Sequence, residues 1–220
     1  MLPKITINCA MSADGKIAKP TGEQLRISSD EDIKRMHQLR NKNDAILVGI
    51  NTVLNDNPKL TVKQKYVNRV TNPIRVILDT KCRTPKDYLA VNEQAKTLIA
   101  TVENCKKKYN QNVEVIQCRK NDEGLIDLKS LLNILYNEYN VRNLMVEGGG
   151  TVIWNFLKQG LCDDLYIYIA PIVIGGANTP TVAEGEGIKN LDEIIKLQIV
   201  NISSLGKGFL FHYKIKKSLD

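Results

Sequence analysis

Aromatic residues, histidines and long apolar runs are all scarce in this sequence of 220 residues. Aromatic side chains make up 5% of it and are not interleaved with basic stretches, which argues against a groove that stacks nucleic-acid bases. No run approaches the roughly 18 apolar residues that cross a bilayer. The first residues also lack the apolar segment of a signal peptide. We therefore expect a cytoplasmic chain with neither a membrane nor a nucleic acid as its partner.

Residues that hold metals or act as nucleophiles are equally few. The two histidines, His37 and His212, are far apart, and neither an H-E-x-x-H nor a G-x-S-x-G motif occurs. The five cysteines are odd in number and include no C-x-x-C pair, so we expect reduced thiols and no metal site. We expect a surface role for His37, in a polar helix, and a packing role for His212, in an apolar strand.

The overall composition is that of a folded protein, with 43% hydrophobic and 25% charged residues. The length suits one domain, which we predict over residues 1–220. The net charge of +7 is uneven: residues 1–110 hold 20 Lys and Arg against 11 Asp and Glu, and residues 111–220 hold 11 against 13. A basic half suggests an anionic partner such as a phosphorylated small molecule, although solvated surface lysines explain it as well.

Short apolar runs alternate with helical patterns, which predicts a three-layer α/β fold with a mostly parallel sheet. Strands are expected at residues 5–9, 45–49, 74–79, 97–101, 113–116, 143–147 and 165–170. Two more, at 197–203 and 209–215, are expected to pair antiparallel. Helices are expected from Ser28 to about Asn41, with Ser28 and Glu31 as a capping box, from a cap at Asp127 to about Tyr139, and from Thr151 to Lys158.

A run of three glycines, Gly148, Gly149 and Gly150, lies between a predicted strand ending at Glu147 and a predicted helix beginning at Thr151. The start of a helix favours an anion, and glycines let a phosphate approach the backbone. The run suits a nucleotide pyrophosphate, although it matches neither the G-x-G-x-x-G nor the P-loop pattern. A tight strand-to-helix connection would explain the same glycines.

Two further stretches suit a nucleotide. Thr80, Lys81 and Arg83 follow a predicted strand, and a hydroxyl with two cations fits the 2′-phosphate of NADP. An exposed basic turn is the alternative. Thr52 and Asp56 are four residues apart, so in a helix they would face the same way and could contact a ribose or an amide. Both could equally be local caps.

Five stretches together resemble the reductase of riboflavin biosynthesis, a dihydrofolate-reductase-like domain that is also the C-terminal half of bacterial deaminase-reductases. The matching residues are 10–18, 44–58, 73–79, 146–150 and 168–171. They occur in the family's order over nearly the whole chain. The resemblance implies a dihydrofolate-reductase-like fold, an NADP-dependent oxidoreductase and a homodimer.

The resemblance also implies roles for individual residues. NADPH would be bound by Ala10, Thr52, Asp56, Thr80, Gly148, Gly149, Gly150 and Thr151, to which the basic turn adds Lys81 and Arg83. A phosphorylated pyrimidine substrate would be contacted by Ser28, Arg40, Leu60, Lys63 and Glu147. Glu147 and Asp14 are the candidate acids, and we favour Glu147 because Asp14 precedes a glycine and suits a turn. The sequence departs from bacterial relatives at Arg26, where they often have Trp, and at Lys63, where they often have Arg.

The deaminase zinc motif is missing and the chain begins at its first predicted strand. It therefore resembles the stand-alone archaeal or fungal type, which reduces the ribosyl group before deamination. The implied substrate is 2,5-diamino-6-ribosylamino-4(3H)-pyrimidinone 5′-phosphate, and the product is its ribitylamino form. Two alternatives stay open: dihydrofolate reductase or another pteridine or pyrimidine reductase of this fold, and a non-catalytic nucleotide or nucleic-acid binding protein.

Overall fold

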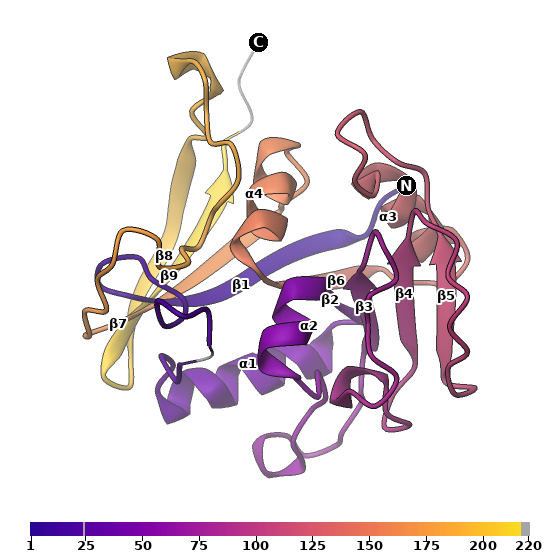
Figure 1. Cartoon of the computed structure of the whole chain (residues 1–220). Coiled ribbons are helices and arrows are strands. Elements are labelled where there is room, and N and C mark those ends of the chain that lie inside the picture. Colours follow the sequence, from indigo (N-terminus) through magenta and orange to yellow (C-terminus); the bar gives the residue numbers. More distant parts are fainter. Residues whose placement is uncertain (24, 217–220) are drawn as a thin grey trace. The chain divides into compact units, whose positions relative to one another are not determined.

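The computed structural model describes residues 1–23 and 25–216 and divides the chain into two compact units. Unit 1 comprises residues 1–4 and 37–145, and unit 2 comprises residues 5–36 and the chain from Val146 onward. The chain passes from one unit to the other after Lys4, within α1 (Asp30–Lys42) and within β6 (Asn143–Gly148); the last two elements are labelled in Figure 1. The single domain over residues 1–220 stays a prediction.

Unit 1 is built on four parallel strands that pair in chain order: β2 (Ala45–Gly49), β3 (Ile74–Leu78), β4 (Thr97–Thr101) and β5 (Val113–Gln117). Figure 1 shows them side by side. All residues of β2 and β4 are buried. This explains their nearly continuous apolar sequences, because a strand covered on both faces has no exposed side that needs polar residues.

Two helices of unit 1 bury apolar faces. In α2 (Ile50–Asp56), Ile50 and Val53 join strand residues such as Val48 and Ile77 in one core cluster. In α3 (Leu128–Asn137), four leucines at helical spacing are buried, as the sequence predicts. The predicted cap is also confirmed, because the Asp127 carboxylate accepts the Ser130 backbone N–H at 3.1 Å.

Unit 2 contains the strands that end the sheet: β1 (Lys4–Ser12), β7 (Asp164–Ala170), β8 (Leu197–Leu205) and β9 (Gly208–Ile215). β1 pairs parallel with β7, whereas β7 with β9 and β9 with β8 are antiparallel. The strand order is β5-β4-β3-β2-β6-β1-β7-β9-β8. The helix α4 (Gly150–Lys158) follows β6. The predicted three-layer α/β fold with antiparallel C-terminal strands is confirmed.

The predicted cap of α1 was wrong by one residue. The helix begins at Asp30, and the Ser29 hydroxyl, not that of Ser28, accepts the Asp32 backbone N–H at 3.3 Å. Ser28 instead donates its hydroxyl to the Asp32 carboxylate at 2.5 Å. The sequence offers two capping pairs with the same spacing, Ser28 with Glu31 and Ser29 with Asp32, so spacing alone cannot choose between the two serines. Asp32 is buried, at 2% exposed, and this burial decides in favour of Ser29 as the cap.

The expectation of five reduced thiols was also wrong, because Cys82 and Cys105 form a disulfide. They lie in the loops that follow β3 and β4, which are parallel neighbours, and their Cα atoms are 5.5 Å apart. Disulfide pairing depends on this distance rather than on sequence spacing, which is 23 residues here. Within the described part of the chain, no helix is long and apolar enough to span a membrane.

Candidate active site

The glycine run connects β6 to α4 in unit 2. Gly148 has φ +119° and Gly149 has φ +41°, conformations that residues with a Cβ disfavour. Gly150 has a packing reason, because a Cβ there would lie 2.5 Å from the Thr181 carbonyl oxygen. No side chain in the described residues caps the start of α4. Tight packing therefore explains part of the run, and the pyrophosphate role of this turn stays a prediction.

The basic turn follows β3 in unit 1. Its first residue after the strand, Asp79, is fully buried and accepts both the backbone N–H and the hydroxyl of Thr84 at 2.7 Å. Asp79 is thus turned into the protein and is a poor partner for a ribose hydroxyl. Lys81 and Arg83 are exposed, and Arg83 donates to the Asn51 side chain at 3.0 Å. Two exposed cations beside a buried Asp79 suit a phosphate.

The third predicted nucleotide stretch is the helix α2. Thr52 and Asp56 are one helical turn apart within it, so they share a face, and both are half-buried. Burial raises the pKa of the Asp56 carboxyl. The Thr80 side chain is also half-buried, and the Thr80 carbonyl accepts backbone N–H groups of Val102 and Glu103, both at 3.1 Å. These two hydrogen bonds connect the loop after β3 to the loop after β4, and the Cys82–Cys105 disulfide connects the same two loops.

The predicted phosphate-binding residues Arg40 and Lys63 belong to unit 1. Arg40, on α1, donates to the Thr61 carbonyl at 2.9 Å, so it contacts the segment that carries Leu60 and Lys63. Lys63 is exposed. Leu60 is 2% exposed and its side chain packs in the core cluster, which leaves mainly its backbone to meet a ligand.

His37 is buried at 3% exposure, which overturns the predicted surface role. Its ring stacks on Tyr66 with centroids 4.9 Å apart, and its Nδ1 accepts the Lys63 backbone N–H at 3.3 Å. The buried residues of α1 are Asp32 and His37 rather than apolar side chains. Hydrophobic periodicity therefore gave no sign of which side of this helix faces inward.

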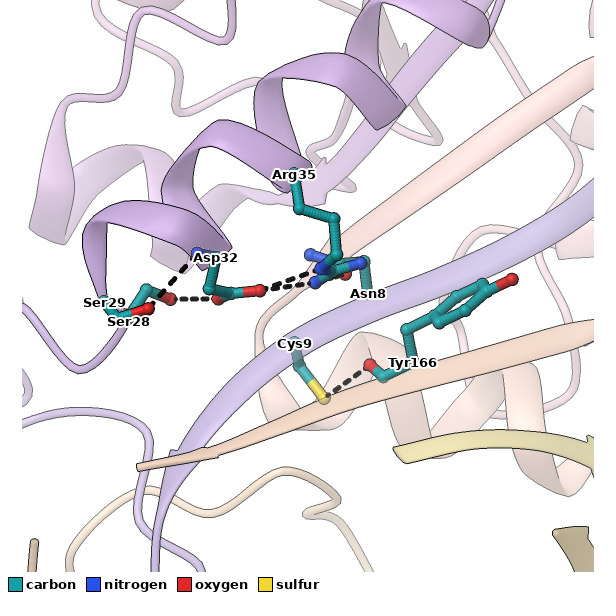
Figure 2. Close-up of polar contacts among 7 residues, drawn as sticks. All are labelled: Asn8, Cys9, Ser28, Ser29, Asp32, Arg35 and Tyr166. Atoms are coloured by element: carbon teal, nitrogen blue, oxygen red, sulfur yellow. Dashed lines mark hydrogen bonds and ion pairs between the residues drawn. The ribbon is translucent and has the colours of Figure 1, made fainter. Parts of the chain in front are cut away.

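Sequence reasoning also missed a polar network around Ser28 in unit 2, shown in Figure 2. The Asp32 carboxylate accepts the Ser28 hydroxyl and two bonds from Arg35, at 2.9 and 2.7 Å. Arg35 also donates to the Asn8 side chain at 2.6 Å. Because the Ser28 proton points to Asp32, its oxygen can only accept from a ligand. The sequence did contain one sign of this network: Asp32 and Arg35 are three residues apart in a predicted helix, a spacing at which opposite charges can pair.

The remaining candidates in unit 2 are Ala10, Asp14 and Glu147. Ala10 lies in β1 opposite Tyr168 of β7. Asp14 accepts the Ser12 hydroxyl at 2.5 Å and the Gly175 N–H at 2.7 Å, and these hydrogen bonds lower its pKa to about 2. Asp14 therefore anchors a turn and stays ionised. Glu147 is half-buried near the end of β6, and its catalytic role stays a prediction.

Arg26 and His212, two further residues discussed from the sequence, both contact neighbouring side chains. Arg26 forms an exposed ion pair with Asp30 at 2.5 Å. His212, in β9, lies 2.7 Å from the Asp164 carboxylate and stacks on Tyr166 with centroids 4.2 Å apart. The packing role expected for His212 is confirmed.

Comparison with known proteins shows what the chain is similar to. The family described as the RibD C-terminal domain matches residues 3–211. The chain is 37% identical to the 2,5-diamino-6-ribosylamino-4(3H)-pyrimidinone 5′-phosphate reductase of Methanothermobacter thermautotrophicus, over 98% of this chain and 100% of that one. It is 39% identical to the reductase of the same name from Archaeoglobus fulgidus, over 95% and 96%. A Thermotoga maritima deaminase/reductase structure superposes with a TM-score of 0.83 at 27% identity, covering 98% of this chain and 57% of that one.

The sheet, its antiparallel C-terminal strands and these likenesses define a reductase with a dihydrofolate-reductase-like fold. The chain belongs to the RibD C-terminal domain family and is a reductase of riboflavin biosynthesis. The family predicted from the sequence is confirmed. Membership favours this function over dihydrofolate reductase and over a non-catalytic binding protein.

Proposed function

We propose that this enzyme uses NADPH to reduce the ribosylamino group of 2,5-diamino-6-ribosylamino-4(3H)-pyrimidinone 5′-phosphate to the ribitylamino form, before deamination. The observation that carries the proposal is the nearly full-length likeness to two archaeal reductases named for that substrate. The basic turn at Lys81 and Arg83, with Asp79 buried behind it, supports NADPH over NADH.

The chain's residues suit a dinucleotide. We place the pyrophosphate on Gly148 to Thr151, because the N-cap of α4 is Gly149, which has no side chain, and no other described side chain caps the start of this helix. Lys81 and Arg83 would hold the 2′-phosphate, with Thr80, Thr52, Asp56 and Ala10 as further contacts. The cofactor supplies a hydride when bound, and the protein's part is to bind, orient and exclude water.

The substrate residues divide by chemistry. Arg40 and Lys63 are cations for the 5′-phosphate, with Lys63 acting as a point charge rather than as a bidentate fork. Leu60 would contribute its backbone. Ser28 offers an acceptor, because its proton is held by Asp32. Glu147 would contact the substrate and hold or release the proton that the reduction requires.

The test is NADPH oxidation with three compounds: the proposed substrate, its deaminated analogue and its dephosphorylated form. We expect preference for the diamino compound. The dephosphorylated form should lose kcat as well as affinity, because remote binding energy positions the reacting carbon. Preference for the deaminated analogue would overturn the order of steps, and equal rates without the phosphate would remove Arg40 and Lys63 from their role.

We further propose that the reaction needs no metal. Across the residues that the structure describes, no group of three or more His, Cys, Asp or Glu side chains is arranged to hold a metal ion. Dialysis against a chelator should leave the rate of NADPH oxidation unchanged. Loss of activity that Mg²⁺ or Zn²⁺ restores would contradict this.

We also propose that two copies of the chain form a homodimer through β8. This strand ends the described sheet and exposes apolar side chains: Leu197, Ile199, Val200 and Ile202 are 37%, 57%, 47% and 47% exposed. An edge strand with such a face is a ready partner for a second chain. A cytoplasmic location stays a prediction, and the Cys82–Cys105 disulfide removes the support that reduced thiols would have given it.

A further inference from the structure

The segment Lys59 to Lys63 has no regular secondary structure, yet side chains hold its backbone at four points. Arg75 donates to the Lys59 carbonyl at 3.3 Å, and Arg40 donates to the Thr61 carbonyl at 2.9 Å. Asn72 accepts the Val62 N–H at 2.9 Å, and His37 accepts the Lys63 N–H at 3.3 Å. Backbone groups near a protein core need such partners when no helix or strand supplies them.

The same segment contains a residue in an unfavourable conformation. Leu60 has φ +51°, which lies in the left-handed region that a residue with a Cβ rarely adopts. Its side chain is 2% exposed, so burial and the surrounding hydrogen bonds maintain this conformation. The segment is therefore held in one shape by its surroundings rather than by local preference.

His37 is the partner at the end of the segment where Lys63 lies. His37 is 3% exposed, and its ring stacks on that of Tyr66, with the centroids 4.9 Å apart and the ring planes at 17°. Burial lowers the pKa of His37 to about 4, and the charges of Arg40, Lys63 and Lys65 act in the same direction. At neutral pH the ring is thus uncharged, and Nδ1 is an acceptor whose partner is the Lys63 N–H.

We propose that His37 is a positioning residue for substrate binding: its Nδ1 fixes the Lys63 peptide so that the exposed ammonium of Lys63 is placed for the 5′-phosphate. This inference rests on the proposed function of Lys63. A flexible lysine on a mobile segment would lose conformational freedom on binding, whereas a backbone already fixed loses less. His37 itself touches neither the substrate nor the cofactor in this role.

Two substitutions separate the hydrogen bond from the ring. His37→Phe keeps an aromatic ring against Tyr66 and removes the acceptor. His37→Asn removes the ring and keeps an oxygen near the position of Nδ1. We expect His37→Phe to lower kcat/KM for the phosphorylated substrate about tenfold, through kcat as well as KM, and to leave NADPH affinity within about twofold. His37→Asn should recover most of the loss. His37→Gln should not recover the loss, because its side-chain oxygen reaches toward the position of Nε2 instead. If His37→Phe fails to fold, His37→Gln takes its place as the variant without the acceptor.

The decisive readout is the preference for the 5′-phosphate, measured as kcat/KM with and without it, and Lys63→Met sets its scale. A reduced preference in His37→Phe, restored in His37→Asn, supports the proposal. If Lys63→Met reduces the preference for the 5′-phosphate but His37→Phe and His37→Gln leave it unchanged, the role of His37 is overturned and that of Lys63 stands. An unchanged preference in Lys63→Met overturns both. A fall in NADPH affinity equal to the loss of kcat/KM would show general damage to the fold and would also refute positioning.

Discussion

At the scale of single residues, Arg83 tests which cofactor the enzyme prefers. Arg83→Ala should reduce kcat/KM for NADPH by about 10- to 100-fold, because a lost charge-assisted contact costs about 1.5–3 kcal/mol. The value for NADH should change little, since NADH lacks the 2′-phosphate. Steady-state kinetics with both cofactors measure this.

The matched control for Arg83 is Lys86→Ala, which removes another exposed cation a few residues further along the same loop. It should leave the ratio of the two cofactors unchanged. Equal use of both cofactors by the native enzyme would contradict the preference for NADPH. An Arg83→Ala variant that lost activity with both cofactors alike would remove Arg83 from the 2′-phosphate site.

His37 makes a separate prediction about pH and stability. The pKa of His37 is about 4 in the folded chain and about 6.5 in the unfolded chain. Between pH 4 and 6.5, His37 is therefore protonated in the unfolded state and neutral in the native state. The free energy of unfolding should therefore fall as pH drops from about 6.5 to 4, by at most about 1.4 kcal/mol per pH unit from this group. Urea unfolding at several pH values measures it.

Comparison with His37→Phe isolates the histidine, because other titrating groups are common to both proteins. The difference in unfolding free energy between native protein and variant should be constant above pH 7 and should shrink at lower pH. A difference that does not change between pH 7 and 4.5 would mean that His37 titrates normally despite its burial.

At the scale of secondary-structure elements, the start and end of α4 offer a paired test of the glycine turn. Gly149, just before the helix, has φ +41°, and Gly160, just after it, has φ +64°. Alanine at either position should cost about 1 kcal/mol of stability, because a Cβ is disfavoured there. Only Gly149→Ala should also weaken NADPH binding, by about tenfold or more, because only that end is proposed to hold the pyrophosphate.

Gly160 is a suitable control because a Cβ there meets no atom within 4 Å, so strain in its own backbone is the effect expected. Cofactor titration by fluorescence, together with thermal unfolding, separates binding from stability. Equal NADPH affinity in both variants would make the glycine run a tight connection and nothing more.

At the scale of the whole molecule, β8 predicts the oligomeric state. The native chain, of 24.7 kDa, should sediment as a dimer. Ile202→Lys places a charge in the exposed apolar face of the edge strand and should give monomers, because charged residues on an edge discourage pairing. Analytical ultracentrifugation over a range of concentrations measures the shift.

Val173→Lys is the control for the dimer, because Val173 is 78% exposed but lies outside β8. It should leave the dimer intact. A native protein that is monomeric at all concentrations, or an Ile202→Lys variant that still dimerises, would rule out β8 as the interface.

Much of this molecule follows from short stretches of sequence. The apolar runs of β2 and β4, the leucine spacing of α3 and the Asp127 cap each depend on residues within one or two turns of one another. Local rules of this kind decide which elements form and in what order, and the order of motifs was enough to identify the family. The nucleotide-like stretches were also visible, because they lie where strands end.

What only the tertiary structure decided depends on residues that are distant in the chain. The Lys63 backbone meets His37, 26 residues earlier, and Cys82 meets Cys105, 23 residues later. Leu60 adopts its conformation because neighbouring side chains hold it there. Such contacts follow from which strands become neighbours and which polar side chains are buried. The hydrophobic periodicity of the sequence reveals neither of these, because it shows which face of a helix or strand is apolar and not which element packs against that face.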